Sequence, residues 1–271
     1  GSAVETGVKT DAAISLNNNL IITVQQSDAN AGSSVAGKGA LNLGFDNALG
    51  GTISANAFGM EVTLKNTQAL SLGTVQGTTV HLTTTSGGMT QATGGAIVAD
   101  KLVVAAADDV TFTNSNTVKV LTANVAGDFS LTNGRALEVG DGSTGVTTTA
   151  GGDVTIETKA GNLKLVNAIT SGNNVTLATT GLFINSVGAS ALSLGTGGVW
   201  RIWSQDPATD TLGGLTPGFK QFNATYGTTT VLGASNKNGV LYTLAPTVSV
   251  AITGTVSKVY DGTRTVTLTG N

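Results

Sequence analysis

Short segments with alternating apolar and polar residues recur along the first two thirds of the chain. Each begins with a polar or turn-forming residue and continues as apolar, polar, apolar, and the middle residue is usually Thr, Ser or His. The clearest copies are 61–64, 79–82, 109–112, 128–131, 153–156 and 174–177, whose first residues lie 18, 30, 19, 25 and 21 positions apart. Successive side chains of a strand point to opposite faces, so each copy predicts a short strand with one apolar and one wet face.

Shorter apolar–x–apolar segments lie between these copies. They are 70–72, 102–104, 118–120, 137–139, 163–165, 182–184 and 192–194. Such strands are too short to stabilise hairpins, but they suffice where each pairs with equivalents one coil above and below. A step near 20 residues with two or three strands per coil predicts an all-β fold, a right-handed parallel β-helix (solenoid). An antiparallel sandwich is the alternative, although it does not require one recurring motif.

Glycine pairs and asparagines mark the expected corners of the coils. Pairs such as Gly87-Gly88 and Gly151-Gly152 supply the positive-φ residues that tight turns need. We expect some of the turn asparagines to stack into hydrogen-bonded ladders between coils. The two long intervals, 83–101 and 140–152, are predicted to be excursions that project from the tube.

The pattern changes near residue 199. Seven of the 12 aromatic residues and all three prolines follow this point. The open end of a solenoid needs a cap, because it exposes the core and unpaired strand edges. We therefore predict a parallel β-helix over 1–198, a C-terminal β cap over 199–247 and the start of a truncated β module over 248–271.

Composition excludes several other classes of protein. The 271 residues include 38 glycines, no cysteine and only 11% charged residues, with a net charge of −3. Hydrophobic residues make up 40%, which argues against disorder, and the glycines have no collagen register. The cations are scattered, so no nucleic-acid partner is expected, and no apolar run predicts membrane insertion. The absence of cysteine suits a secreted bacterial protein and excludes disulfides and thiolate chemistry.

The C-terminal quarter carries a resemblance to a known family. Residues 198–215 (GVWRIWSQDPATDTLGGL), followed by 222–226 (FNATY), resemble a segment found late in filamentous-haemagglutinin-like exoproteins, the secreted partners of two-partner secretion systems. Residues 257–263 (SKVYDGT) resemble the opening of the YDG-type repeats that often follow in such adhesins. The β-helical part is similar to the family in its general pattern only.

This resemblance implies a long β-helix that is exported unfolded through an outer-membrane transporter and serves in adhesion or in a biofilm matrix. The family's Asn-Pro-rich secretion domain is not visible, since 17–20 (NNNL) lacks the proline. Residues 1–3 do not resemble a signal peptide, and the chain ends within a pattern. We expect a piece from the C-terminal end of the rod, whose transporter contacts lie in regions absent here.

Three aromatic residues are candidates for contact with a glycan: Trp200, Trp203 and Tyr226. Alternation along the strand sends the two tryptophans to opposite faces, so at most one of them lies on a given surface. Packing of the cap over the end of the solenoid is the competing interpretation. Two triplets, at Asn174 and Asn223, match the N-glycosylation sequon, and some family members are glycosylated.

Other candidate chemistry is sparse, and we expect no catalytic residue, metal or cofactor. His81 is the only histidine and is expected to point outward without a nearby acid. The pair 108–109 (two aspartates) with Lys101 and Lys119 is the best enzyme-like cluster, but Asp109 occupies a recurring turn position. The turn 141–145 offers one aspartate, too few oxygens for calcium.

These observations favour a structural and adhesive rod segment of a large secreted bacterial adhesin, for attachment at a cell surface, between cells or in a biofilm matrix. The expected partner is a glycan, a matrix polysaccharide or a host surface receptor. A polysaccharide-binding module and a polysaccharide-acting β-helix enzyme are the alternatives.

Overall fold

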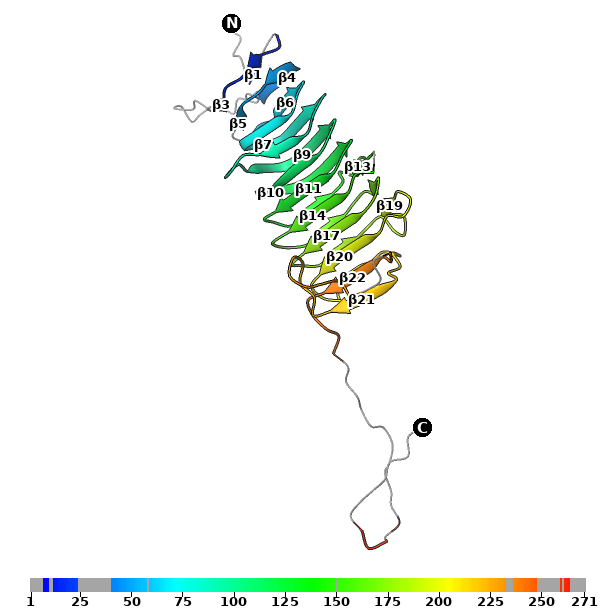
Figure 1. The fold of residues 1–271 in the computed structure, drawn as a ribbon. Coiled ribbons are helices and arrows are strands. Elements are labelled where there is room, and N and C mark those ends of the chain that lie inside the picture. The colour runs from blue at the N-terminus through cyan, green and yellow to red at the C-terminus, as the bar shows by residue number, and fades with distance from the viewer. Residues whose placement is uncertain are drawn as a thin grey trace, which may run out of the picture.

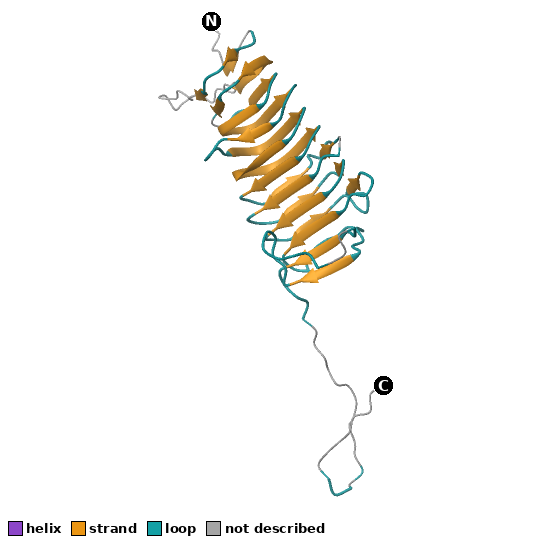
Figure 2. Cartoon of the chain, in the orientation of Figure 1, coloured by secondary structure: helices purple, strands orange, loops and turns teal. Residues whose placement is uncertain are grey.

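The structure is a β-solenoid of about nine turns, seen in a computed structural model (Figures 1 and 2). It describes residues 7–9, 12–23, 40–57, 59–149, 151–232, 236–247, 259 and 261–263. These residues contain strands and loops but no α-helix. Every pairing between the named strands is parallel, which confirms the predicted stack of coils and excludes the antiparallel sandwich.

The four longest strands, of 10 to 16 residues, all lie in the N-terminal half, and each described strand after them has at most five residues. In chain order, the strands are β1 (Gly7–Lys9), β2 (Ser15–Leu16), β3 (Leu20–Thr23), β4 (Ala40–Leu49), β5 (Thr52–Asn56), β6 (Val62–Asn66), β7 (Leu70–Thr84), β8 (Met89–Gln91), β9 (Ile97–Ala106), β10 (Val110–Val125), β11 (Phe129–Asn133), β12 (Leu137–Val139), β13 (Val146–Thr148), β14 (Val154–Thr158), β15 (Leu163–Leu165), β16 (Ile169–Ser171), β17 (Val175–Thr179), β18 (Phe183–Asn185), β19 (Leu192–Leu194), β20 (Trp200–Ser204), β21 (Phe219–Phe222) and β22 (Gly239–Tyr242).

Each coil contributes to three columns of paired strands. In the later coils the columns are separate: β11, β14, β17 and β20 form the first, β12, β15 and β18 the second, and β13, β16 and β19 the third. The long strands β7 and β10 pass through a corner and take part in more than one column. Because neighbouring coils pair residue for residue, each outward position forms a row along the solenoid.

The recurring motif occupies two different columns, which the sequence spacing does not reveal. Segment 62–64 pairs with 80–82, and 80–82 pairs with 102–104. Segment 110–112 instead lies in the column that runs from 70–72 through β8 and continues through β11, β14 and β17. The step of 30 residues therefore marks a change of column rather than an insertion.

The predicted projecting loop at 83–101 is therefore wrong. This stretch completes β7, forms β8 and begins β9, all paired within the stack. The second predicted excursion, 140–152, is wrong in extent, because β13 lies within it and pairs with β10 and β16. What remains is a short loop at 140–145 between β12 and β13.

The interior of the tube is apolar and nearly closed to solvent. Val, Leu, Ile and Phe from all three columns form one continuous core, with Phe112, Phe129 and Phe183 as its largest buried side chains after Tyr242. Burial of each large apolar side chain stabilises the fold by roughly 1.5–3 kcal/mol before conformational entropy is counted.

Buried asparagines bond the backbones of adjacent coils at the strand ends. The amide of Asn66 accepts a hydrogen bond from Leu49 N (2.7 Å) and donates one to Leu49 O (3.0 Å). Asn133 makes the same pair of bonds with Val118, at 2.7 and 2.9 Å. Each side chain is fully buried and acts like an additional peptide group. These amides link adjacent coils inside the tube, but they bond backbone groups at strand ends and not one another, so they differ from the ladders of turn asparagines that the sequence predicted.

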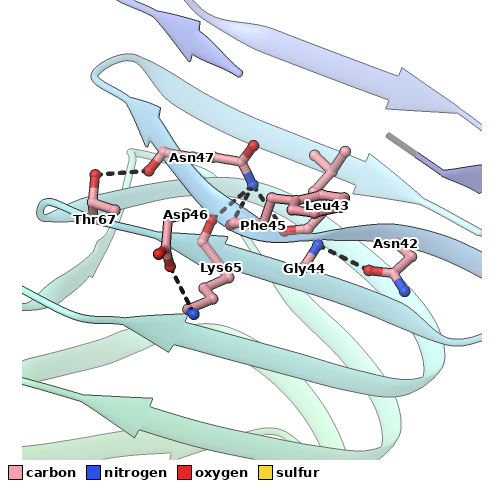
Figure 3. A network of polar contacts seen from close by, with 8 residues as sticks. All are labelled: Asn42, Leu43, Gly44, Phe45, Asp46, Asn47, Lys65 and Thr67. Carbon is pink, nitrogen blue, oxygen red and sulfur yellow. Dashed lines mark hydrogen bonds and ion pairs between the residues drawn. The ribbon is translucent and has the colours of Figure 1, made fainter. Parts of the chain in front are cut away.

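A second type of buried asparagine closes a bulge in the strand (Figure 3). In β4 the amide nitrogen of Asn47 lies within hydrogen-bond distance of three carbonyls, those of Leu43, Phe45 and Lys65, at 2.9–3.0 Å. Asn116 makes the equivalent contacts in β10. Both bulges fall where the register with the next coil shifts. The amide thus satisfies carbonyl groups that the interrupted ladder leaves open.

An outer corner carries a row of carboxylates that bond from one coil to the next. Asp109 Oδ1 accepts a hydrogen bond from Asp128 N, Asp128 Oδ1 from Asp153 N, and Asp153 Oδ1 from Asn174 N, each at 2.8 Å. A Cβ at Gly127 would lie 2.1 Å from Asp109 Oδ1, so glycine is required beside this row. The aspartate turn position therefore bonds the next coil rather than its own backbone.

At the C-terminal end of the stack, β22 lies between β20 and β21. β20 pairs with β17 on one side and with β22 on the other, and β21 pairs with the far edge of β22 (Figure 1). Lys220 on β21 is in register with Val240 on β22, which is in turn in register with the core residue Ile202 on β20. Lys220 is nevertheless exposed. A charge at an inward position resists further stacking. Most of 248–271, with its predicted β module, lies outside the described residues.

Candidate functional site

The two tryptophans of β20 lie on opposite faces of the strand, as alternation predicts. Trp200 lies in the main core and is 4% exposed. The predicted glycan contact at Trp200 is therefore wrong, because the ring is enclosed by the solenoid. Trp203 faces outward and belongs to a separate apolar cluster with Ala178, Ala224 and Leu241. This cluster is the packing of the cap that the competing interpretation predicts.

Register explains how the cluster forms. Ala178, Trp203 and Leu241 occupy equivalent positions on β17, β20 and β22, so they form one outward row. The segment after β21 folds over this row and buries Ala224 against it. Tyr226, half-buried, lies edge-on to Trp203 with ring centroids 5.7 Å apart and an interplanar angle of 65°. The cap thus covers the outer face of the sheet as well as its end.

A hollow of about 180 Å³ remains between this segment and the sheet. Its lining combines the two rings with a carboxylate and several hydroxyl groups. The lining residues are Glu157, Thr158, Ala178, Thr179, Thr180, Trp203, Ser204, Ala224, Thr225, Tyr226 and Thr243. The hollow joins segments up to 86 positions apart, and it is the strongest candidate binding site among the described residues.

Glu157 supplies the charge at this site. It lies one coil before Ala178 in the same outward row and is a quarter exposed. Its carboxylate accepts a long hydrogen bond from Thr132 Oγ1 (3.4 Å) and lies 3.5 Å from Lys159 Nζ. A carboxylate accepts about four hydrogen bonds, so these contacts leave it with capacity for more. Burial, and secondarily the charge of Glu157, raises the pKa of Tyr226, which keeps its hydroxyl protonated.

Several donors at the hollow lack a protein acceptor. Among the described residues, no group accepts a hydrogen bond from Trp203 Nε1 or from the hydroxyls of Thr180, Thr225 and Tyr226. The Trp203 side chain is the notable one, because the residue is only 6% exposed. Buried tryptophans usually find a partner for the indole N–H. Nothing in the sequence marks Glu157 or Thr180 as part of a site, and Thr225 stands out only as the third residue of the sequon at Asn223.

A second polar group of the cap lies inside the end of the solenoid. Asp210 accepts hydrogen bonds from Phe183 N (2.9 Å) and from Ser204 Oγ. Burial raises the pKa of Asp210 and also raises that of Tyr242 to about 12. These contacts fix the excursion 205–218 to β18 and β20, so this cluster is structural.

The two sequons lie in different surroundings. Asn174 belongs to the polar outer corner: its Oδ1 accepts from Val199 N (3.0 Å) and its Nδ2 donates to Asp153 Oδ1 (3.2 Å). Asn223 is exposed and has a positive φ of 54°. Sequons are used on surface loops, and of the two only Asn223 has that setting.

The enzyme-like cluster does not assemble. Lys101 pairs with Asp141, Nζ to Oδ2 at 2.7 Å, while the Asp109 carboxylate is bonded to Asp128 N. The Lys101 hydrogen bond, followed by those of Thr144 N and Ser143 N, lowers the pKa of Asp141. The carboxylate oxygens of the turn 141–145 therefore already accept hydrogen bonds from protein groups. His81 does have an acidic neighbour, contrary to expectation, with Nε2 3.6 Å from Glu61 Oε1.

Comparison with known proteins adds no identification. No family model, no curated protein and no solved structure matches the chain. Within the described ranges, no group of three or more potential metal ligands is found. Among the same residues, no helix combines the length and apolar character of a membrane span.

Proposed function

We propose that the chain is a rigid, adhesive rod segment of a large secreted bacterial adhesin, which attaches at cell surfaces, between cells or in a biofilm matrix. The observation that carries this proposal is the parallel pairing of successive coils from β4 to β22. Such a stack holds its two ends apart at a fixed distance, as a spacer between anchoring and binding modules requires. The family resemblance of 198–215, 222–226 and 257–263 also supports it.

The outer surface suits multivalent contact. Outward positions form rows in register, for example Ser130, Thr155 and Thr176. Hydroxyl rows repeat at the interval between strands, about 4.8 Å. Many weak contacts of this kind add to a strong attachment when they are presented together. The transporter partner and the extracellular location belong to the same proposal.

Bead attachment tests the proposal directly. Beads coated with the chain should be retained under flow on surfaces bearing matrix polysaccharides or host glycans, above beads coated with an unrelated β-solenoid. Retention equal to that control would overturn adhesion. Release of reducing sugars from the same polysaccharides, abolished by Asp109→Ala, would replace the rod with the enzyme alternative.

A further inference from the structure

The hollow beside Trp203 and Tyr226 has the parts of a sugar subsite. A pyranose presents C–H groups on one face and hydroxyl groups around its edge. Aromatic rings suit the first, and a carboxylate with hydroxyl groups suits the second. Glu157, Thr180, Thr225 and the two rings place both kinds of group around one hollow of about 180 Å³.

The orphaned indole points to an occupant with an acceptor atom. Trp203 is almost fully buried, lines the hollow, and donates to no described residue. A ring or hydroxyl oxygen of a sugar would accept that hydrogen bond. Water would also do so, but water would gain nothing from the apolar surface of Tyr226.

The site is held in shape before any ligand binds. Trp203 is wedged between Ala178, Leu241 and Ala224 in its own apolar cluster. The covering segment is tied by Gln221, whose side chain donates to Thr230 O (2.9 Å) and accepts from Leu232 N (2.8 Å). Preorganisation lowers the entropy cost of binding, which matters for a ligand as small as one sugar unit.

Charge defines the class of sugar. Glu157 is the one ionisable carboxylate of the lining residues, and Lys159 does not line the hollow. An acidic sugar would bring a second carboxylate toward Glu157, whereas a neutral sugar donates hydroxyl protons to it. We propose that the hollow binds a single uncharged sugar unit of a glycan, with Glu157 excluding acidic sugars. This inference rests on the proposed adhesive function and names its ligand class.

Titration of the whole chain with methyl glycosides of glucose, galactose, mannose and N-acetylglucosamine tests the site, by saturation-transfer NMR and calorimetry. We expect saturable binding of at least one of these, and none of methyl glucuronide. Glu157→Gln should lower the affinity for the neutral sugar by about tenfold, because a charged acceptor becomes neutral. It should also reduce the discrimination against glucuronide. Trp203→Phe removes the N–H while keeping most of the packing, and it should weaken binding by about three- to tenfold.

Glu138→Gln is the matched control. Like Glu157, Glu138 is a partly exposed strand carboxylate beside a lysine, Lys164, but it lies outside the hollow. It should bind sugar as the wild type does, and thermal unfolding checks that all variants fold. Failure of all four neutral glycosides to bind, or equal binding by Glu157→Gln and Glu138→Gln, would overturn the subsite. Unchanged bead retention in Glu157→Gln would show that adhesion uses another surface, leaving the rod proposal intact.

Discussion

Two corners of the solenoid hydrogen-bond neighbouring coils with different polar side chains. The inner corner uses buried amides, as Asn66 and Asn133 bond both the N–H and the carbonyl of a residue one coil away. The outer corner uses carboxylates, as Asp109, Asp128 and Asp153 each accept a hydrogen bond from a backbone N–H of the next coil. An interior position requires a neutral group that both donates and accepts, whereas water solvates the unused oxygen of an exposed carboxylate.

Removing a buried amide should have the largest effect. Asn133→Ala leaves the N–H and carbonyl of Val118 without partners inside the tube. We expect the free energy of unfolding to fall by about 3 kcal/mol, since each unsatisfied buried group costs roughly 1–3 kcal/mol. Urea denaturation measures this change. A loss equal to that of an exposed corner substitution would show that burial does not distinguish the two corners.

The half-buried carboxylate of Asp210 in the cap extends the comparison through its pH dependence. Burial raises the pKa of Asp210 above its unfolded value, so its contribution to stability is present when it is protonated and is lost as the pH rises through the folded pKa. Asparagine stays neutral at every pH, so we expect the free energy of unfolding of Asp210→Asn to fall less than that of the wild type as the pH rises across the carboxyl range. The difference between the two proteins should be smaller than the loss caused by Asn133→Ala. Thermal unfolding at a series of pH values tests this, and an unchanged profile would contradict it.

An exposed ladder carboxylate should matter less. Asp128→Ala removes the acceptor of Asp153 N, and we expect a loss of about 1 kcal/mol. Asp128→Asn should retain most of the stability, because Asn174 already serves the same ladder by accepting from Val199 N. Urea midpoints of the two variants measure the difference. Equal losses would mean that the charge, not the hydrogen bond, is what the corner uses.

The smallest effect is expected at an exposed ion pair between coils. Glu138 and Lys164 lie 3.1 Å apart on adjacent coils, and both side chains are about two fifths exposed. A double-mutant cycle with Glu138→Gln and Lys164→Met should give a coupling of roughly 0.2–1 kcal/mol that falls with added salt. A larger coupling that does not change with salt would show that this exposed pair contributes to stability as strongly as the buried amides do.

Much of the fold was predictable because alternation is a local property. The apolar–Thr–apolar segments and the spacing near 20 residues predict stacked parallel coils, and the structure confirms them. The same local rule correctly sends Trp200 and Trp203 to opposite faces of β20, and the structure decides that Trp200 is the inward one. The candidate site was only partly predictable: Trp203 and Tyr226 do lie together, but Glu157 was not recognised as their neighbour.

The sequence by itself determined the parallel solenoid and the inward or outward direction of most strand residues, because period-2 patterning depends only on the strand. Tertiary structure alone decided which column each motif joins, so that 83–101 became paired strand instead of loop. It also placed β22 between β20 and β21, and Glu157 beside Tyr226. These outcomes depend on which strands pair across a coil or more of intervening chain. The geometry of the corners and the packing of the cap decide which strands pair. Neither can be inferred from the residue pattern of a single strand.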